Sequence, residues 1–135
     1  MQPGLVTAVL VNWNSGPDLA VCLGRLQAQT YRHLEVVVVD NGSSDGSLEA
    51  VPAYGGPVRV LENGHNAGFC RAFNQGLNLA DGEFILSLNA DVWMATDFIE
   101  ALVETLRHAP QAGMACGKLL SGTGPADGRR LDSTG

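Results

Sequence analysis

The stretch LEVVVVDNGSSDGS, residues 34–47, decides the fold. Its four consecutive valines form an apolar run, which is typical of a strand buried on both faces of a parallel sheet. The run stops at Asp40, and the segment from Asp40 to Gly46 is rich in the short polar residues and glycines that form turns. A helix-capable segment, Ser47 to Val51, follows and is closed by Pro52. The stretch therefore predicts a strand, a turn and a helix in that order.

The same order of apolar run, polar turn and helical pattern occurs before and after this stretch. Further strands are expected at Leu5–Val11, Val58–Leu61 and Phe84–Leu88, helices at Asp18–Gln29, Gly68–Ala80 and Thr96–His108, and the start of a fifth strand at Met114–Leu119. Strands that alternate with helices favour a mostly parallel sheet with helices on both faces. The predicted fold class is α/β, a Rossmann-like three-layer sandwich.

The composition is that of one globular domain. The chain has 135 residues, 45% of them hydrophobic and 16% charged, so neither a disordered tail nor a membrane span is expected. Eight basic and fourteen acidic residues give a formal charge of −6. Sequence-independent binding of nucleic acid needs a basic surface that neutralises phosphates. No nucleic-acid partner is therefore expected.

Several side chains are expected in the core on spacing alone. The helical pattern from 68 to 80 places five apolar side chains on one face, namely Phe69, Ala72, Phe73, Leu77 and Ala80. The three cysteines, Cys22, Cys70 and Cys116, are far apart and form no CxxC pair. We interpret them as buried free thiols of a protein in a reducing compartment. The apolar N-terminal stretch is too short for a membrane span, so the predicted location is cytoplasmic.

Short polar side chains follow four of the expected strands. They are Asn12 and Asn14, Asp40 and Asn41, Asn63, His65 and Asn66, and Asn89 and Asp91. Parallel strands present their carboxyl ends at one edge of the sheet, which is where such sheets bind ligands. This pattern favours a nucleotide or sugar site. Each cluster taken alone is better explained by turn formation or helix capping, but its recurrence at all four strand ends weakens that interpretation.

Two common phosphate-binding motifs are missing. The chain contains no G-x-x-x-x-G-K-[ST], and Asn12 to Pro17 replaces the G-x-G-x-x-G that would follow the first strand of a dinucleotide-binding fold. A diphosphate ligand would then need a hard cation, Mg²⁺ or Mn²⁺, which proteins often hold through one or two carboxylates. Asp91 is the best ligand for that cation. Its alternative interpretation is a turn or N-cap aspartate.

Four motifs in register resemble family 2 glycosyltransferases. After VLVNWNS (9–15) come VVVVDNGSSDGS (36–47), ENGHNAGFCRAFNQGL (62–77) and FILSLNADV (84–92). The likeness is strongest to rhamnosyltransferase-like bacterial enzymes that build cell-surface polysaccharide, and it extends from Leu5 to Lys118. It implies the glycosyltransferase A fold.

The resemblance assigns roles to positions at the first two strand ends. It implies that Asn12, Trp13 and Asn14 lie beside the nucleotide base of the donor. Asp40, followed by Asn41, is implied to hydrogen-bond that base, and a carboxylate acceptor suits the N–H of uracil or thymine.

The other two motifs are implied to meet the donor phosphates. The N-x-G-F-x-x-A-x-N pattern matches Asn66, Gly68, Phe69, Ala72 and Asn74. Arg71 within it is a candidate phosphate ligand, with a solvated surface charge as the alternative. The family's D-x-D is here Asn89-Ala90-Asp91, a departure that leaves Asn89 for a ribose hydroxyl and Asp91 for Mg²⁺ or Mn²⁺.

The function implied is inverting transfer of a sugar from a UDP- or dTDP-sugar to a hydroxyl of a glycan or lipid-linked acceptor, in cell-surface polysaccharide or cell-wall synthesis. A lipid-linked acceptor would bring the protein to the inner face of the plasma membrane as a peripheral protein. Two alternatives are a non-catalytic nucleotide-binding module and a sugar-1-phosphate nucleotidyltransferase. The second would need a glycine-rich basic loop after the first strand, which Asn12 to Pro17 lacks.

The expected organisation is a nucleotide-sugar-binding part over residues 1–120 and a loop or hairpin over 121–135 that leads to an absent C-terminal portion. The family places its catalytic base, an aspartate or glutamate, well downstream of the D-x-D segment. We therefore assign no catalytic residue, expect the base beyond Gly135, and expect these 135 residues alone to be inactive.

Overall fold

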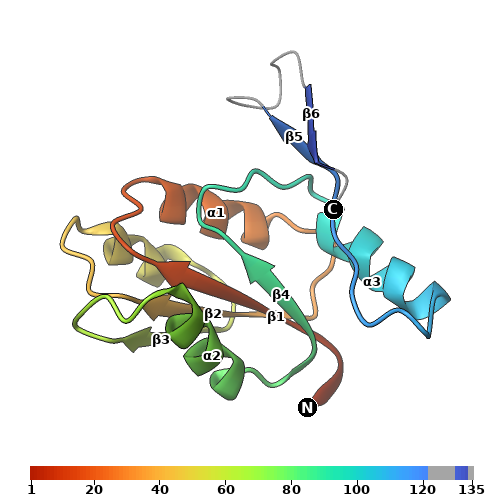
Figure 1. Cartoon of the computed structure of the whole chain (residues 1–135), viewed down its shortest axis with the longest axis horizontal. Helices are drawn as coiled ribbons and strands as arrows, with labels where there is room; N and C mark the ends of the chain where they lie inside the picture. Colours follow the sequence, from red (N-terminus) through yellow and green to blue (C-terminus); the bar gives the residue numbers. More distant parts are fainter. Residues whose placement is uncertain (122–129, 134–135) are drawn as a thin grey trace.

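A computed structural model describes residues 1–121 and 130–133 of the chain (Figure 1). Its elements are β1 (Gln2–Asn12), α1 (Asp18–Gln27), β2 (Leu34–Asp40), the 3₁₀ helix η1 (Ser47–Ala53), β3 (Val58–Glu62), α2 (Phe69–Leu79), β4 (Gly82–Leu88), α3 (Phe98–His108), β5 (Leu119–Ser121) and β6 (Arg130–Ser133). Strands β1 to β4 form one sheet in the order β3-β2-β1-β4, and every neighbouring pair is parallel. The predicted parallel α/β class is confirmed.

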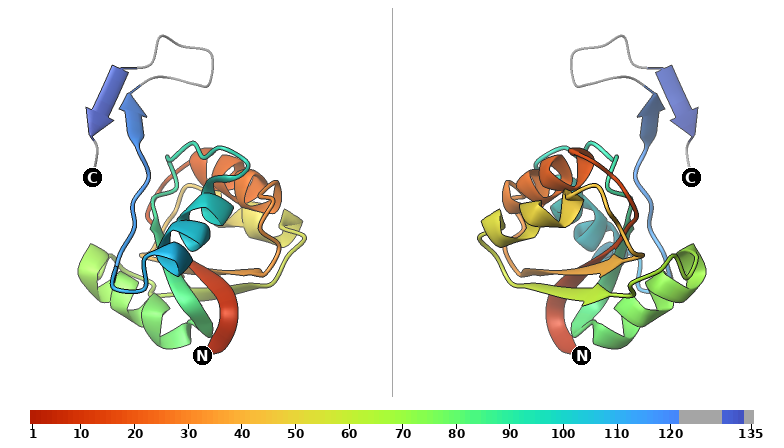
Figure 2. Two further views of the ribbon diagram at one scale, coloured as in Figure 1. Left: turned by 90° about the vertical axis from the view of Figure 1, so that its right-hand side faces the viewer. Right: turned by 90° about the vertical axis from the view of Figure 1, so that its left-hand side faces the viewer.

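The sheet is the middle of three layers. Helices α1 and α3 and the short η1 cover one face, and α2 covers the other (Figures 1 and 2). Successive side chains of a strand point to opposite faces, so Val36 and Val38 of β2 pack under α1, whereas Val37 and Val39 pack under α2. This is why the four-valine run has no polar position: both faces of β2 are core.

Helix α2 lies unusually close to the sheet through small residues. A side-chain carbon added at Gly76 would come within 2.4 Å of a Val9 methyl group, and the neighbouring contact residue is Ala72, which is fully buried. The predicted apolar face of this helix is therefore partly wrong. Phe69 is 51% exposed and Leu77 is 37% exposed, because the helix axis is positioned by Ala72 and Gly76.

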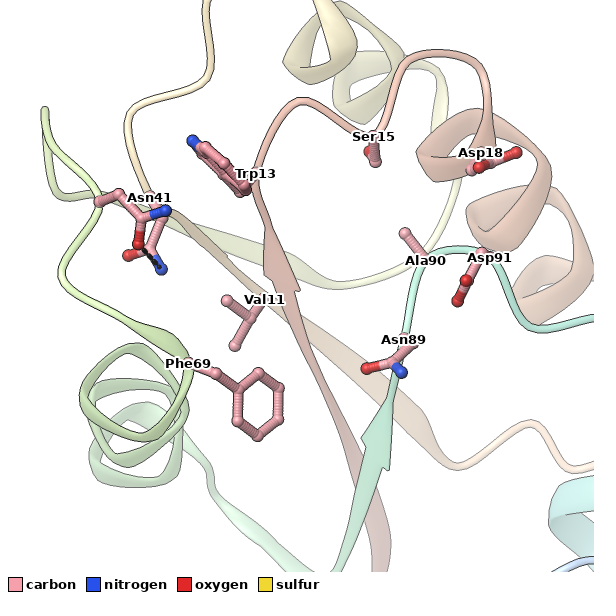
Figure 3. Close-up of a pocket in the computed structure, with 10 residues that line it drawn as sticks. Val11, Trp13, Ser15, Asp18, Asn41, Phe69, Asn89, Ala90 and Asp91 are labelled. Atoms are coloured by element: carbon pink, nitrogen blue, oxygen red, sulfur yellow. Dashed lines mark hydrogen bonds between the residues drawn. The ribbon is translucent and has the colours of Figure 1, made fainter.

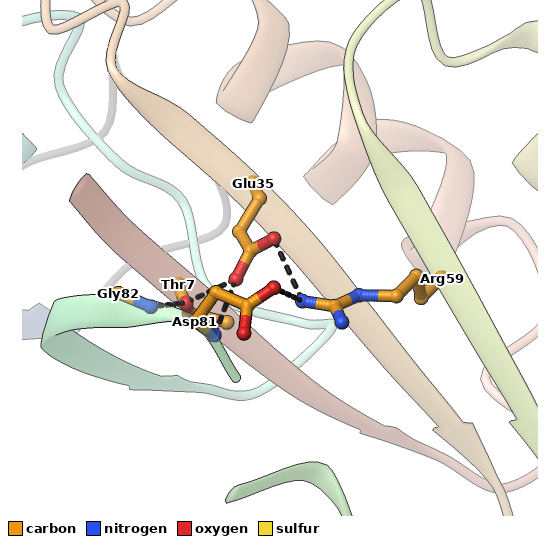
Figure 4. A network of polar contacts seen from close by, with 5 residues as sticks. All are labelled: Thr7, Glu35, Arg59, Asp81 and Gly82. Atoms are coloured by element: carbon orange, nitrogen blue, oxygen red, sulfur yellow. Dashed lines mark hydrogen bonds and ion pairs between the residues drawn. The ribbon is translucent and has the colours of Figure 1, made fainter. Parts of the chain in front are cut away.

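A polar network joins three strands to the turn between α2 and β4 (Figure 4). The Glu35 carboxylate accepts hydrogen bonds from the Thr7 hydroxyl (2.6 Å) and the Asp81 N–H (2.9 Å), and it pairs with Arg59 at 2.8 Å. Thr7 in turn accepts from the Gly82 N–H at 2.9 Å. Partial burial opposes ionisation of Glu35, but these donors outweigh it, so the pKa of Glu35 lies below its ordinary value.

The chain beyond α3 departs from the prediction. Residues 114–118 form no strand, and the fifth strand starts only at Leu119. It pairs antiparallel with β6 in a separate two-stranded sheet. Gly117 packs so tightly on the Phe98 ring that a side-chain carbon there would lie 2.4 Å from it. The residues before β5 are thus held against the start of α3.

The burial predicted for the cysteines holds for one of them. Cys22 is buried, while Cys70 and Cys116 are exposed and all three are free thiols. Cys70 follows Phe69 on the side of α2 that faces away from the sheet, so its prediction as a core thiol was wrong. In the part of the chain that the structure describes, no helix has the length and hydropathy needed to cross a membrane.

Candidate functional site

A pocket of about 380 Å³ opens at the carboxyl edge of the sheet, where the strands β1, β2 and β4 end (Figure 3). Its lining comes from the end of β1, from the loops after β1, β2, β3 and β4, and from the first residues of α1 and α2. The residues are Val11, Trp13, Ser15, Asp18, Asn41, Asn66, Phe69, Asn89, Ala90 and Asp91. The volume lies within the range of small-molecule sites.

Asn12 organises the loops beside this pocket. Its side chain is fully buried, and its amide nitrogen lies 2.8 Å from Asp40 Oδ1, 3.0 Å from Ser43 Oγ and 2.9 Å from Ser47 Oγ. Its carbonyl oxygen accepts the hydroxyl of Ser15. Since one amide has two N–H groups, these acceptors share them. The loop after β1 is thereby tied to the loop after β2.

Asp40 is engaged within the protein. Its Oδ1 accepts from Asn12 and the Ser43 hydroxyl (2.6 Å), and its Oδ2 accepts from the backbone N–H groups of Gly42 (3.0 Å) and Ser43 (2.9 Å). A carboxylate has about four lone-pair positions, and these four donors fill them. The residue is only 2% exposed. In this structure Asp40 holds the turn that follows β2.

A second set of bonds closes the same two loops at the surface. Asn14, which has a positive φ of 48°, accepts from the Ser44 N–H at 2.9 Å. Asp45 accepts from the N–H groups of Gly16 (2.7 Å) and Ser47 (3.0 Å). The hydrogen bonds from Ser47 and Gly16 lower the pKa of Asp45 below its ordinary value. These contacts orient the start of α1 toward the pocket.

A chain of amides fixes the opposite wall. Asn63 and Gln75 exchange two hydrogen bonds of 2.9 Å, and Asn63 also donates to Asn41 at 3.0 Å. Asn66 accepts from the Gly68 N–H at 2.9 Å, which places the first turn of α2 beside the pocket. Side chains that the sequence pattern suggests as ligands are thus partly used to build the wall.

Two carboxylates, Asp18 and Asp91, face the pocket from the same side (Figure 3). Asp18 opens α1, and Asp91 lies in the loop after β4. The thiol of Cys22, on α1, senses this charge: burial, together with the Asp91 carboxylate and against the opposing effect of Arg25, raises the pKa of Cys22 to about 12. The loop that carries Asp91 lies against α1, where the Cys22 thiol contacts the Asn89 carbonyl oxygen at 3.9 Å.

The structure brings some of the sequence-predicted residues together and leaves others apart. Trp13, Asn41, Asn66, Asn89 and Asp91 line the pocket, whereas Asn12, Asn14, Asp40 and Arg71 do not. Arg71 is exposed in the first turn of α2 and forms no hydrogen bond or ion pair with the described residues.

Sequence reasoning missed half of the lining, namely Val11, Ser15, Asp18, Phe69 and Ala90. The sequence pattern marks Asp18 only as a helix start, and it gives Phe69 the spacing of a core residue as well as a place in the N-x-G-F motif. A usable signal did exist: both residues open a helix that follows a strand, and such positions meet the carboxyl edge of a parallel sheet.

The comparisons with known proteins decide the family. The model of Glycosyl transferase family 2 matches residues 7–133. The chain belongs to this family. Its fold is the predicted glycosyltransferase A fold, as the solved family 2 relatives show.

Among curated relatives of this family 2 chain, "Glycosyltransferase GlyG" of Streptococcus pneumoniae is 32% identical over 107 residues, 77% of this chain and 36% of GlyG. Poly-beta-1,6-N-acetyl-D-glucosamine synthase of Staphylococcus aureus is 25% identical over 120 residues, 83% of this chain and 28% of the synthase. The chain thus spans about a third of the length of these relatives.

Two solved structures superpose well on the family 2 chain. The mannosyltransferase PcManGT of Pyrobaculum calidifontis, in complex with GDP-Man and Mn²⁺, has a TM-score of 0.70 and 32% identity over 75% of this chain and 32% of its own. TarS 1–349 of S. aureus, in complex with UDP-GlcNAc, has a TM-score of 0.72 and 25% identity over 77% of this chain and 31% of its own.

Proposed function

We propose that this family 2 domain binds a UDP- or dTDP-sugar in the pocket and serves in inverting transfer of the sugar to a hydroxyl of a glycan or lipid-linked acceptor. A rhamnosyl donor of a bacterial surface polysaccharide is the specific case we favour. The observation that carries the proposal is the composition of the pocket: exposed aromatic rings on one side and two carboxylates on the other. Relatives that bind nucleotide-sugars support it.

The aromatic side of the pocket suits the nucleobase of the donor. Trp13 is 57% exposed and Phe69 about half exposed, and both line the pocket on the side of α2 and β1 (Figure 3). Flat rings that are open to solvent offer a stacking surface for a nucleobase. The exposed side-chain amide of Asn66 lies on the same wall and can donate to a carbonyl oxygen of uracil or thymine, while the buried Asn41 amide donates to Asn66 and to the Gly68 carbonyl at 3.4 Å each. Asn12, Asn14 and Asp40 act in this proposal by holding the loop that carries Trp13 and Asn41.

The carboxylate side suits a metal-bound diphosphate. Among the described residues that line the pocket, two are aspartates and none is lysine, arginine or histidine. Two phosphates would therefore meet repulsion unless a cation came with them. Asp91, with Asp18 nearby, offers the hard oxygen donors that Mg²⁺ and Mn²⁺ prefer. Within residues 1–121 and 130–133 no cluster of three His, Cys, Asp or Glu side chains forms, so phosphate oxygens would complete the coordination.

Such a cation would act as a Lewis acid that stabilises the departing nucleoside diphosphate. The chain's own residues orient the donor: Asp91 sets the position of the diphosphate, Asn89 hydrogen-bonds a ribose hydroxyl, and Arg71 reaches the outer phosphate oxygens from α2. In the transfer, the acceptor oxygen bonds to the anomeric carbon as the bond to the diphosphate oxygen breaks, and a general base takes the acceptor's proton. The base is not assigned to a described residue.

Thermal unfolding in the presence of nucleotide tests the binding step. We expect UDP or dTDP with Mn²⁺ at about 100-fold excess over Kd to stabilise the chain by about 2.7 kcal/mol, a shift of roughly 8 °C for a domain of this size. With EDTA the same nucleotide concentration should give a much smaller shift, because nucleotide binding without the cation is weaker. Asp91→Asn, which keeps the shape of the side chain, should abolish the effect of Mn²⁺, while Asp97→Asn, in the same loop but outside the pocket, should preserve it.

The nucleotide panel should include GDP, because one structural relative binds GDP-Man. A larger shift with GDP than with UDP or dTDP would overturn the pyrimidine assignment. No shift with any nucleotide and Mn²⁺ would overturn the proposed function.

Transfer is measured separately, with radiolabelled dTDP-rhamnose and UDP-hexoses and a hydroxyl acceptor on lipid vesicles. Since the chain spans about a third of its relatives, we expect donor binding without transfer from these 135 residues, and we expect transfer from a longer chain. A longer chain that binds donor but neither hydrolyses nor transfers it would favour a non-catalytic nucleotide-binding module. Formation of nucleotide-sugar from a sugar 1-phosphate would favour a nucleotidyltransferase.

A further inference from the structure

Helix α1 grips the loop that carries Asp91. This loop, residues 89–97, connects β4 to α3. At the first residue of the loop, the Cys22 thiol of α1 contacts the carbonyl oxygen of Asn89 at 3.9 Å. One turn along the helix, the Arg25 guanidinium lies over the ring of Trp93, with 4.1 Å from its carbon Cζ to the ring centroid, and it donates to the carbonyl oxygen of Met94 at 3.3 Å.

The far end of the loop is held by the residues that follow α1. Gln29, which is fully buried, donates to the Ala95 carbonyl at 2.7 Å and accepts from the Ile99 N–H at 3.0 Å. The Thr30 N–H donates to the Thr96 carbonyl at 2.8 Å. Asp91 itself is exposed and lies between the contacts of Cys22 and Arg25. Its position therefore depends on how the backbone is held on each side.

Packing alone does not account for an arginine at position 25. Its Nε–H is buried and finds no hydrogen-bond partner among the described residues, which carries a desolvation cost that a methionine or leucine would avoid. Its planar cation stacks on an aromatic face and bonds a backbone carbonyl at once, which neither lysine nor an apolar residue can do equally well. Both partners, Trp93 and Met94, directly follow the segment with the proposed metal ligand.

We infer that Arg25 is a positioning residue for Asp91: by clamping Trp93 and Met94 onto α1 it holds the aspartate in the orientation that binds a divalent cation with the donor diphosphate. The inference rests on the proposed function. It goes beyond it by assigning the metal-binding geometry to a residue that lies outside the pocket and touches no ligand.

Calorimetric titration of the full 135-residue chain with UDP, in Mn²⁺ and separately in EDTA, tests the inference. Arg25→Met keeps the apolar stem and removes the clamp. We expect it to raise the Kd for UDP in Mn²⁺ by about tenfold, the lower end for residues that support a metal ligand, and to leave the Kd in EDTA unchanged. Arg25→Lys keeps the charge over Trp93 and should recover part of the loss. Arg32→Met, which removes a comparable arginine bound to the Gln27 carbonyl, is the matched control and should bind like wild type.

A second variant covers the case in which Arg25→Met does not fold. Trp93→Leu removes the other half of the stacked pair and should weaken UDP binding in Mn²⁺ but not in EDTA. Tryptophan emission gives a readout without ligand. In a Trp13→Phe background Trp93 is the single indole, and Arg25→Met should make it more accessible to quenching by acrylamide.

The outcomes separate the two proposals. If the wild type binds UDP neither in Mn²⁺ nor in EDTA, the proposed function is overturned and this inference with it. Mn²⁺-dependent binding by the wild type that survives unchanged in both Arg25→Met and Trp93→Leu would overturn the positioning role alone. An equal loss in Mn²⁺ and in EDTA would also overturn it, because a general distortion of the pocket weakens both.

Discussion

Replacing Asn12 by aspartate should make the stability of this protein depend steeply on pH. In the wild type the Asn12 amide nitrogen lies 2.8 Å from Asp40 Oδ1, and both side chains are buried. The Asn12→Asp variant places a carboxylate oxygen where that N–H donor was. Two unit charges at this separation repel by about 6 kcal/mol at an effective dielectric constant of 20.

Protonating the new carboxyl group costs less free energy than this repulsion. Keeping the new carboxyl neutral costs about 1.4 kcal/mol for each pH unit above its unfolded pKa of about 3.9, or about 4 kcal/mol at pH 7. Its folded pKa is thus raised well above its ordinary value. A group with a raised folded pKa contributes its full stability below the unfolded pKa and loses it as pH rises. The variant should therefore lie within about 1 kcal/mol of wild type near pH 4, and fall further behind by about 1.4 kcal/mol for each pH unit above that until the raised folded pKa is reached.

Urea unfolding followed by circular dichroism at several pH values between 4 and 8 measures this difference. The control is Asn14→Asp, which adds the same charge at an exposed position where the side-chain oxygen already accepts the Ser44 N–H. It should differ little from wild type at any pH. A gap between Asn12→Asp and wild type that does not grow with pH would refute the placement of Asn12 against the Asp40 carboxyl group.

The remaining predictions concern packing, acid stability and thiol reactivity. Gly76→Ala should cost about 1–3 kcal/mol, because its methyl group would meet Val9 at 2.4 Å; an unchanged urea midpoint would contradict the close approach of α2. The pKa of Glu35 is lower in the folded protein, so its ionised carboxylate stabilises the fold above the unfolded pKa of about 4.3, and this stabilisation is lost as pH falls through the lower folded pKa. Glu35→Gln should therefore reduce the loss of stability at acid pH. An acid-induced loss identical to that of wild type would contradict this. The buried Cys22, with its pKa near 12, should resist a thiol reagent at pH 8 until the chain unfolds, whereas the two exposed cysteines react at once; fast reaction of all three would show that Cys22 is accessible.

Much of the fold follows from local pattern. The four valines of β2 are buried on both faces, and strands alternate with helices along the chain. These two patterns predict a parallel sheet between two layers of helices. Failures occurred where spacing alone set the expectation. Phe69 has the spacing of a core residue, yet small residues at 72 and 76 draw α2 toward the sheet and leave its ring at the pocket. The segment from Met114 has strand-compatible residues, yet residues 114–118 pair with neither edge strand of the sheet, β3 or β4.

The candidate site shows the same division. Polar strand ends predict which edge of the sheet holds the site, and Trp13, Asn41, Asn66, Asn89 and Asp91 do line the pocket there. Sequence cannot tell which polar groups face a ligand and which satisfy each other. Asp40 illustrates this, since its four internal donors come from Asn12 at the end of β1 and from Gly42 and Ser43 in the loop after β2.

The layer architecture, the family and the edge of the sheet at which the candidate pocket lies could therefore be predicted from sequence. These follow from periodicity and from motifs that are local along the chain. Three features are visible only in the tertiary structure. Asp18 lies with Asp91 in the pocket, Asn12 and Asp40 hydrogen-bond each other and hold the loops after β1 and β2, and Arg25 contacts the loop after β4. The physical reason is that hydrogen-bond satisfaction and close packing depend on groups far apart in the chain, which meet only when the strands are in register.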